Sequence, residues 1–177
     1  MRSAASADDF LRDGAPEIAL VGRSNVGKSS LINALVRQKI ARTSAAPGKT
    51  RLANIYRVAG AFYLVDLPGY GYARGGSGDF ADLTRMVFAR DVSALLLIDA
   101  RHPGLGSDVS AWNWLANTVA ATALVATKID KLSRAERQRA MREIEAVFHQ
   151  PATAVSAETG EGLEDLWKLI DRMTKSR

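Results

Sequence analysis

The chain has 177 residues, a length that fits one domain with one sizeable hydrophobic core. It contains no cysteine, which excludes disulfides, thiolate metal sites and cysteine nucleophiles and favours a reducing compartment such as the cytoplasm. Apolar runs do not exceed strand length, so no membrane-spanning helix is expected, and the net charge of +5 is compatible with a polyanionic partner.

Residues 1–16 are small, polar and partly acidic, and they lack the apolar stretch of a signal peptide. They are predicted to form a flexible N-terminal arm, with residues 17–177 forming a single domain. In that domain, strand-length apolar runs alternate with helical patterns. Strands are predicted at 17–21, 52–58, 61–66, 93–99, 121–127 and 151–155, and helices at 28–37, 80–90, 108–118, 133–148 and 162–174.

This alternation predicts an α/β fold, a six-stranded, mostly parallel sheet with helices on both faces. Only Ala59 and Gly60 separate the second and third strands, so these two strands should form an antiparallel hairpin, with the second at the sheet edge. Asp108 and Ser133 stand where helix N-caps are expected.

A complete GxxxxGK[ST] phosphate-binding loop follows the first predicted strand. A strand that turns through glycine into a helix directs backbone N–H groups and the positive end of the helix dipole into one cavity, which suits phosphate. Lys28 should reach the terminal phosphates, and the Ser29 hydroxyl should ligate Mg²⁺. The predicted contacts are Gly22, Arg23, Ser24, Asn25, Val26, Gly27, Lys28, Ser29 and Ser30.

The loop before the second strand is predicted to contribute Gly48, Lys49, Thr50, Arg51 and Leu52. A threonine at this place can complete Mg²⁺ coordination only when a γ-phosphate is present, which would make the loop a switch. An ordinary proline turn explains the same residues equally simply.

The third strand ends in Asp66-Leu67-Pro68-Gly69. At the carboxyl end of a strand beside the phosphate loop, Asp66 can hold Mg²⁺ through a water molecule. Gly69 can offer its N–H to a γ-phosphate, because glycine allows close backbone approach. Taken alone, this tetrapeptide is also a common turn.

The fifth strand ends in Thr127-Lys128-Ile129-Asp130. The Asp130 carboxylate can accept hydrogen bonds from N1–H and the exocyclic amino group of guanine, a donor pair that adenine lacks. The aliphatic stem of Lys128 can cover the base. Thr127 replaces the more usual asparagine and should weaken a structural contact without changing specificity. Ser156, Ala157 and Glu158 follow the last strand, where the Ala157 N–H could donate to guanine O6.

In this order, the segments GRSNVGKSSLIN, ARTSAAPGKT, DLPGYGYA, TKID and SAE resemble the TRAFAC-class GTPases, and more narrowly the EngB (YihA/YsxC) family of bacterial ribosome-biogenesis GTP-binding proteins. The resemblance runs from about Glu17 to Lys175. It implies a Ras-like fold, binding of GTP and GDP with Mg²⁺, action in assembly of the large ribosomal subunit, and a link to cell division and septation. It also implies a cytoplasmic monomer whose partner is the large subunit or its precursor, with no role for DNA or a membrane.

Many small GTPases orient the attacking water with a glutamine directly after the D-x-x-G motif, and this chain has Tyr70 there. A phenol lacks the paired donor and acceptor of an amide, so slow intrinsic hydrolysis is expected, with Lys28 and Asn25 assisting. A partner or K⁺ could complete the site, with Asn25 as the K⁺ ligand; alternatively, Asn25 only satisfies backbone groups of the loop. An ATP-dependent enzyme, or a module that holds GTP or GDP with negligible hydrolysis, stays open as an alternative.

Overall fold

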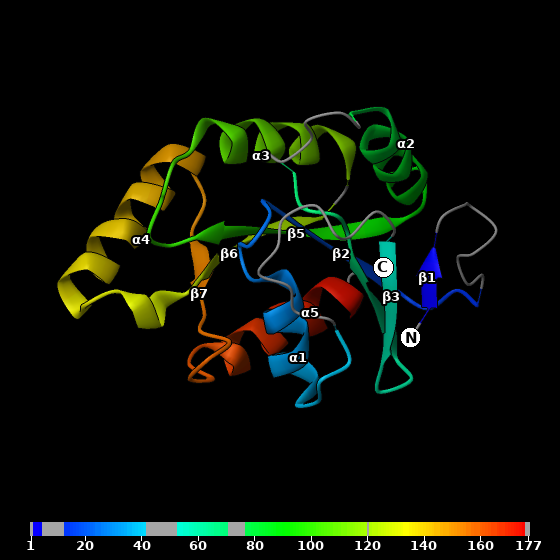
Figure 1. Cartoon of the computed structure of the whole chain (residues 1–177), viewed down its shortest axis with the longest axis horizontal. Coiled ribbons are helices and arrows are strands. Elements are labelled where there is room, and N and C mark those ends of the chain that lie inside the picture. The colour runs from blue at the N-terminus through cyan, green and yellow to red at the C-terminus, as the bar shows by residue number, and fades with distance from the viewer. Residues whose placement is uncertain (1, 5–12, 42–52, 71–76, 120, 176–177) are drawn as a thin grey trace.

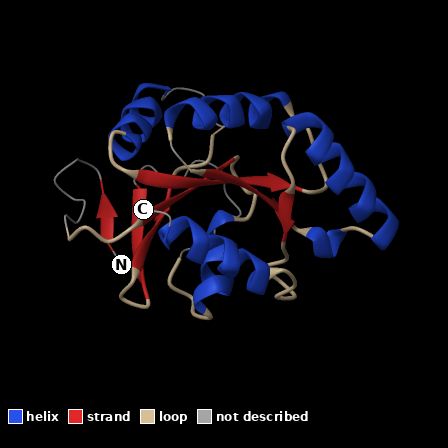
Figure 2. Ribbon diagram, turned by 180° about the vertical axis from the view of Figure 1, so that it is seen from behind, coloured by secondary structure: helices blue, strands red, loops and turns tan. Residues whose placement is uncertain are grey.

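The computed structural model describes residues 2–4, 13–41, 53–70, 77–119 and 121–175. A seven-stranded sheet in the order β1-β3-β4-β2-β5-β6-β7 forms its centre, with helices on both faces (Figures 1 and 2). The strands are β1 (Arg2–Ala4), β2 (Glu17–Gly22), β3 (Ala53–Val58), β4 (Phe62–Asp66), β5 (Val92–Asp99), β6 (Thr122–Thr127) and β7 (Ala152–Ala154). The helices are α1 (Lys28–Val36), α2 (Ser77–Phe88), α3 (Gly106–Thr118), α4 (Arg134–Phe148), α5 (Leu163–Lys175) and the short 3₁₀ helix η2 (Ile129–Lys131).

The mostly parallel sheet and the predicted hairpin are confirmed. Neighbouring strands run parallel from β4 through β2, β5 and β6 to β7, whereas β3 pairs antiparallel with β4. The hairpin turn uses Ala59 and Gly60, both with positive φ (49° and 72°). The Ala61 N–H donates to the Val58 carbonyl at 2.9 Å, and Val58 pairs with Phe62, so the loop has three residues where two were predicted.

The sheet has one strand more than the six predicted, which corrects the expected edge position of β3. Strand β1 pairs antiparallel with β3, from Arg2 opposite Ile55 to Ala4 opposite Ala53. The segment Arg2-Ser3-Ala4 has no apolar alternation, and backbone hydrogen bonds alone can hold so short a strand, so the sequence pattern could not reveal it. The division into an arm at 1–16 and a domain at 17–177 stays a prediction, with residues 5–12 outside the described ranges.

Two hydrophobic cores lie on opposite faces of the sheet. Helices α2, α3 and α4 cover one face, and α1 and α5 cover the other (Figure 1). Strand β5 is buried along its whole length and serves both cores, with Leu96 and Ile98 in one and Leu95 and Leu97 in the other. Alternate side chains of a strand point to opposite faces, so a strand covered on both sides needs an unbroken apolar run.

One of the two predicted helix caps forms and the other does not. Ser133 caps α4 in a capping box with Glu136. Asp108 is not an N-cap, because α3 begins at Gly106 after Leu105, and Asp108 lies inside the first turn with its side chain buried. Among the described helices, none combines the length and the hydrophobicity needed to cross a membrane.

Candidate nucleotide-binding site

The predicted motifs converge at one edge of the sheet. Strands β2, β4, β5, β6 and β7 run parallel, so their carboxyl ends meet there. The phosphate loop leaves β2, the Asp66 motif ends β4, the Asp130 motif follows β6, and Ser156 follows β7. Gly48, Lys49, Thr50, Arg51 and Leu52 lie outside the described residues.

The phosphate loop turns sharply from β2 into α1. Asn25 and Gly27 adopt positive φ values of 61° and 110°, and α1 begins at Lys28. Gly22 is packed tightly, because a Cβ there would lie 2.8 Å from Val26 Cγ1 and 3.0 Å from the Leu97 carbonyl oxygen. The loop therefore keeps its shape through backbone conformations and contacts that larger residues would disturb.

Lys28 is buried inside this loop. Its Nζ donates to the carbonyl oxygens of Gly22 at 3.1 Å and Arg23 at 3.3 Å. Burial lowers the pKa of Lys28, and the nearby Asp66 carboxylate raises it in part. Two neutral carbonyls are weaker partners for an ammonium group than an anionic phosphate oxygen would be. The Lys28 ammonium therefore already lies in the loop that is expected to bind the terminal phosphates.

Ser29 and Asp66 meet beside Lys28. The Ser29 hydroxyl donates to Asp66 Oδ2 at 3.1 Å, which brings together two of the three predicted Mg²⁺ ligands. Asp66 is 3% exposed; burial raises its pKa, and the Lys28 ammonium and the Ser29 hydroxyl oppose that rise. Mg²⁺ prefers oxygen ligands and keeps several of its waters, so a hydroxyl and a carboxylate fit this ion.

Gly69 and Tyr70 lie directly against the phosphate loop. The Ser24 N–H donates to the Tyr70 carbonyl at 3.2 Å, and the Tyr70 N–H donates to the Gly22 carbonyl at 3.3 Å. A Cβ on Gly69 would lie only 2.5 Å from the Ser24 nitrogen. The Tyr70 hydroxyl donates to Asp108 Oδ1 at 2.8 Å, and burial, together with that carboxylate, raises the pKa of Tyr70.

The Thr127 motif is joined to the phosphate loop by two side chains. The Thr127 hydroxyl lies 2.7 Å from the Val26 carbonyl oxygen. Lys128, itself at a φ of 60°, donates from Nζ to the Asn25 carbonyl at 2.5 Å and to Asp99 Oδ2 at 2.9 Å. The segment expected to bind the base is thereby fixed relative to the segment expected to bind phosphate.

Asp99 is a site residue that sequence reasoning missed. Besides Lys128 it binds Arg101, whose Nη2 lies 2.7 Å from Asp99 Oδ2. Burial raises the pKa of the Asp99 carboxyl, but the hydrogen bonds from Arg101 and Lys128 outweigh it and hold that pKa well below its usual value. An acidic residue that ends a buried apolar strand at the functional edge was the available signal.

The Asp130 carboxylate is held by Ser156, which follows β7, the last strand of the sheet. The Ser156 hydroxyl donates to Asp130 Oδ1 at 2.7 Å and accepts from the N–H groups of Glu158 and Thr159 at 3.2 and 3.1 Å. Burial raises the pKa of Asp130, but the hydrogen bonds from Ser156 and Lys131 outweigh it, so that pKa is lowered. The side chain is therefore an ionised acceptor, with Ser156 next to it.

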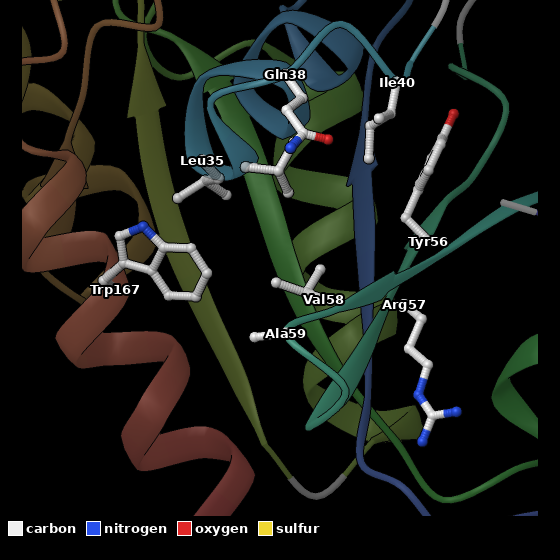
Figure 3. A pocket seen from close by; sticks show the side chains of 9 residues that line it. Leu35, Gln38, Ile40, Tyr56, Arg57, Val58, Ala59 and Trp167 are labelled. Atoms are coloured by element: carbon white, nitrogen blue, oxygen red, sulfur yellow. The ribbon is translucent and has the colours of Figure 1, made fainter.

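A separate cavity of about 400 Å³ lies at the other end of α1. Figure 3 shows it between the C-terminal end of α1, the hairpin of β3 and β4, and Trp167 of α5. Leu35, Val58 and Trp167 are among its mainly apolar lining residues, and none of the predicted nucleotide contacts lines it.

Comparisons with known proteins agree with this geometry. The model of a family described as 50S ribosome-binding GTPase matches residues 17–151. A probable GTP-binding protein EngB of Pelotomaculum thermopropionicum is 44% identical, over 96% of this chain and 91% of that protein. Its counterpart in Chlorobaculum parvum is 46% identical, over 90% of this chain and 88% of that protein.

Two crystal structures show the same fold. That of a probable GTP-binding protein engB superposes with a TM-score of 0.71 at 23% identity, covering 91% of this chain and all (100%) of that chain. Aquifex aeolicus Era bound to GDP.AlF4⁻ gives a TM-score of 0.75 at 23% identity, covering 90% of this chain and 57% of that chain.

Proposed function

Because this chain belongs to the EngB family of GTP-binding proteins, we propose that it is a GTPase switch for assembly of the large ribosomal subunit. In this proposal it binds GTP and GDP with Mg²⁺, hydrolyses GTP slowly, and acts in the cytoplasm as a monomer needed for normal cell division and septation. One observation carries the assignment of the site: the Lys128 ammonium lies 2.5 Å from the Asn25 carbonyl oxygen, which sets base and phosphate motifs side by side.

The roles of the binding residues follow from their positions. N–H groups of the phosphate loop and the Lys28 ammonium receive the phosphates. Asp130 accepts from N1–H and the amino group of guanine, and Ser156 holds that carboxylate in place. The Ala157 N–H donates to guanine O6. Gly69 offers its N–H to the γ-phosphate.

Ser29 and Asp66 are the described residues proposed to hold Mg²⁺, Asp66 through a water molecule, and Thr50 is the proposed third ligand when a γ-phosphate is bound. The bound ion would neutralise charge on the β- and γ-phosphate oxygens. Asp66 also faces Lys28, so the carboxylate and the ammonium balance each other in a buried place.

Slow hydrolysis is supported by the position of Tyr70. Its hydroxyl is engaged with Asp108, and a phenol cannot offer a water molecule the paired donor and acceptor of glutamine. The same contact favours a second candidate function, a regulatory module that holds GTP or GDP with negligible hydrolysis. Single-turnover hydrolysis with and without large subunits separates the two, since only a switch should be accelerated.

The ribosomal role is supported by the matched family, described as ribosome-binding, and by the net charge of +5. Co-sedimentation with large subunits tests it. We expect the chain to pellet with subunits when it holds a non-hydrolysable GTP analogue and to stay in the supernatant with GDP. Equal pelleting with both nucleotides would refute the switch.

The variant Asp130→Asn supplies a matched control for this experiment. An amide at position 130 should favour xanthine over guanine, because it can donate to the xanthine oxygen that replaces the guanine amino group. The variant should therefore lose co-sedimentation with the GTP analogue and regain it with the corresponding XTP analogue.

A further inference from the structure

Arg23 of the phosphate loop pairs with Tyr70, the residue that follows Gly69. Arg23 and Tyr70 form a parallel bridge, held by the backbone bonds from Ser24 to Tyr70 and from Tyr70 to Gly22. This bridge is offset by one residue from the β2–β4 ladder, which ends with Leu20 opposite Asp66, so the segment after β4 carries one extra residue. Paired residues of parallel strands point their side chains to the same face of a sheet. Arg23 and Tyr70 therefore lie beside each other on one face.

Both side chains reach a single buried carboxylate oxygen on that face. Asp108 Oδ1 lies 2.8 Å from the Tyr70 hydroxyl and 3.2 Å from Arg23 Nε, and Asp108 is 0% exposed. Asp108 comes from the first turn of α3, an element distant in sequence from both partners. A buried charge is tolerated when it is paired, and removing one partner is costly. The three residues thus form one cluster.

Gly69 directly precedes Tyr70, a member of this cluster. A Cβ on Gly69 would lie 2.5 Å from the Ser24 nitrogen, so the Gly69 backbone lies directly against the phosphate loop. Because Tyr70 is held at its backbone by the phosphate loop and at its hydroxyl by Asp108, the peptide before it cannot drift from Ser24. A donor that is already in place costs no reorganisation when its ligand arrives.

We propose that Asp108 is a positioning residue that fixes Gly69 and Tyr70 against the phosphate loop and thereby favours the triphosphate over the diphosphate. The inference rests on the proposed function, because it assigns the Gly69 N–H to the γ-phosphate. Burial raises the pKa of Asp108, and the Tyr70 hydroxyl and the Arg23 guanidinium offset only part of that rise.

The test compares the dissociation constants of GDP and of a non-hydrolysable GTP analogue, both with Mg²⁺, for the full chain and two variants. Tyr70→Phe removes only the hydroxyl, and Asp108→Asn keeps the size of the side chain but removes its charge. Each variant should bind the GTP analogue about tenfold more weakly, the scale of one hydrogen bond to a charged group, and GDP as before.

Tyr63→Phe is the matched control, because the Tyr63 hydroxyl also donates to an aspartate, Asp13, at 2.7 Å but far from the phosphate loop. It should leave the ratio of the two affinities unchanged. Equal weakening of both nucleotides, or a gain in triphosphate preference, in Tyr70→Phe would overturn the proposal, even if Asp108→Asn fails to fold. If the unmodified chain binds neither nucleotide, the proposed function itself fails.

Discussion

The Thr127 hydroxyl donates to the Val26 carbonyl oxygen at 2.7 Å, although the two residues are 101 positions apart in the sequence. The same hydroxyl lies 3.1 Å from the Ile98 carbonyl oxygen. A hydroxyl carries one proton, so it satisfies one of these acceptors at a time. Thr127 is buried, and the phosphate loop therefore depends on a side chain of the base motif for one of its backbone contacts.

Replacing Thr127 with valine should lower stability without altering base preference. The change keeps the shape of the side chain but leaves a buried carbonyl without its donor, which costs about 1–3 kcal/mol. For a domain of this size, the melting temperature should fall by a few degrees. Thermal unfolding measures the loss of stability, and competition between GDP and ADP measures the base preference. Thr127→Ser, which keeps the hydroxyl, should behave nearly as the native chain does, and a shift toward ADP in Thr127→Val would contradict the structural role.

Asp130→Asn should move the preference from guanine toward xanthine nucleotides. Ser156→Ala is the matched control, since it removes the hydroxyl that orients Asp130 at 2.7 Å but leaves the carboxylate. It should weaken GDP binding while keeping guanine preferred. Competition of GDP and XDP for the site measures both variants. An Asp130→Asn protein that still prefers GDP would remove the base assignment.

Asp99→Asn should destabilise the protein, and the size of the loss should depend on pH. The Asp99 carboxylate binds Lys128 at 2.9 Å and Arg101 at 2.7 Å, and a hydrogen bond to a charged group contributes about 1.5–3 kcal/mol. The folded-state pKa of Asp99 lies below the unfolded value of 3.8, so its stabilisation is present above that pH and lost as pH falls below it.

Urea unfolding of the native chain and Asp99→Asn at several pH values measures this effect. The difference in unfolding free energy should be largest near neutrality and should shrink below about pH 4, where the unfolded chain takes up a proton. A difference that grows in acid would show that the carboxylate is not the stabilising form.

The sequence allowed prediction of the parts of this site that lie within single motifs. Lys28, Ser29 and Asp66 were expected together because a phosphate loop and a strand-ending aspartate each carry a local pattern, and the Ser29–Asp66 contact at 3.1 Å unites them. The hairpin followed in the same way from the two residues Ala59 and Gly60, which are too few for a crossover. The nucleotide contacts predicted for Gly48 to Leu52 lie outside the described residues and stay predictions.

Contacts among three elements could not be predicted. Arg23, Tyr70 and Asp108 each belong to a different segment, and only the register that pairs Arg23 with Tyr70 brings them together. From its spacing alone, Asp108 was expected to be a helix cap, and that prediction was wrong because two donors bind it inside the first turn. Local sequence propensity contains no information about a hydrogen-bond partner that is distant in the chain.

K⁺ should accelerate GTP hydrolysis relative to Na⁺ if Asn25 is a cation ligand. Asn25 has a φ of 61°, and asparagine is also favoured there for purely conformational reasons. Asn25→Gly separates the two roles, because glycine keeps this conformation but has no amide. Single-turnover hydrolysis in the two salts should show a K⁺ advantage that the variant loses. Equal rates for the native chain would leave Asn25 with the conformational role alone.

Gly69→Ala should weaken binding of a GTP analogue more than binding of GDP. The added methyl would meet the Ser24 nitrogen at 2.5 Å and the Ser24 Cα at 2.6 Å, and both are backbone atoms that cannot rotate away. The Gly69 peptide must therefore move from the phosphate loop, which withdraws its N–H from the γ-phosphate. Gly106→Ala is the matched control, because a Cβ there meets nothing within 4 Å and the methyl group should be accommodated without a shift of the backbone. Titration calorimetry measures the affinity of both variants for the GTP analogue and for GDP. A Gly69→Ala protein that retains its full affinity for the GTP analogue would rule out Gly69 as a γ-phosphate contact.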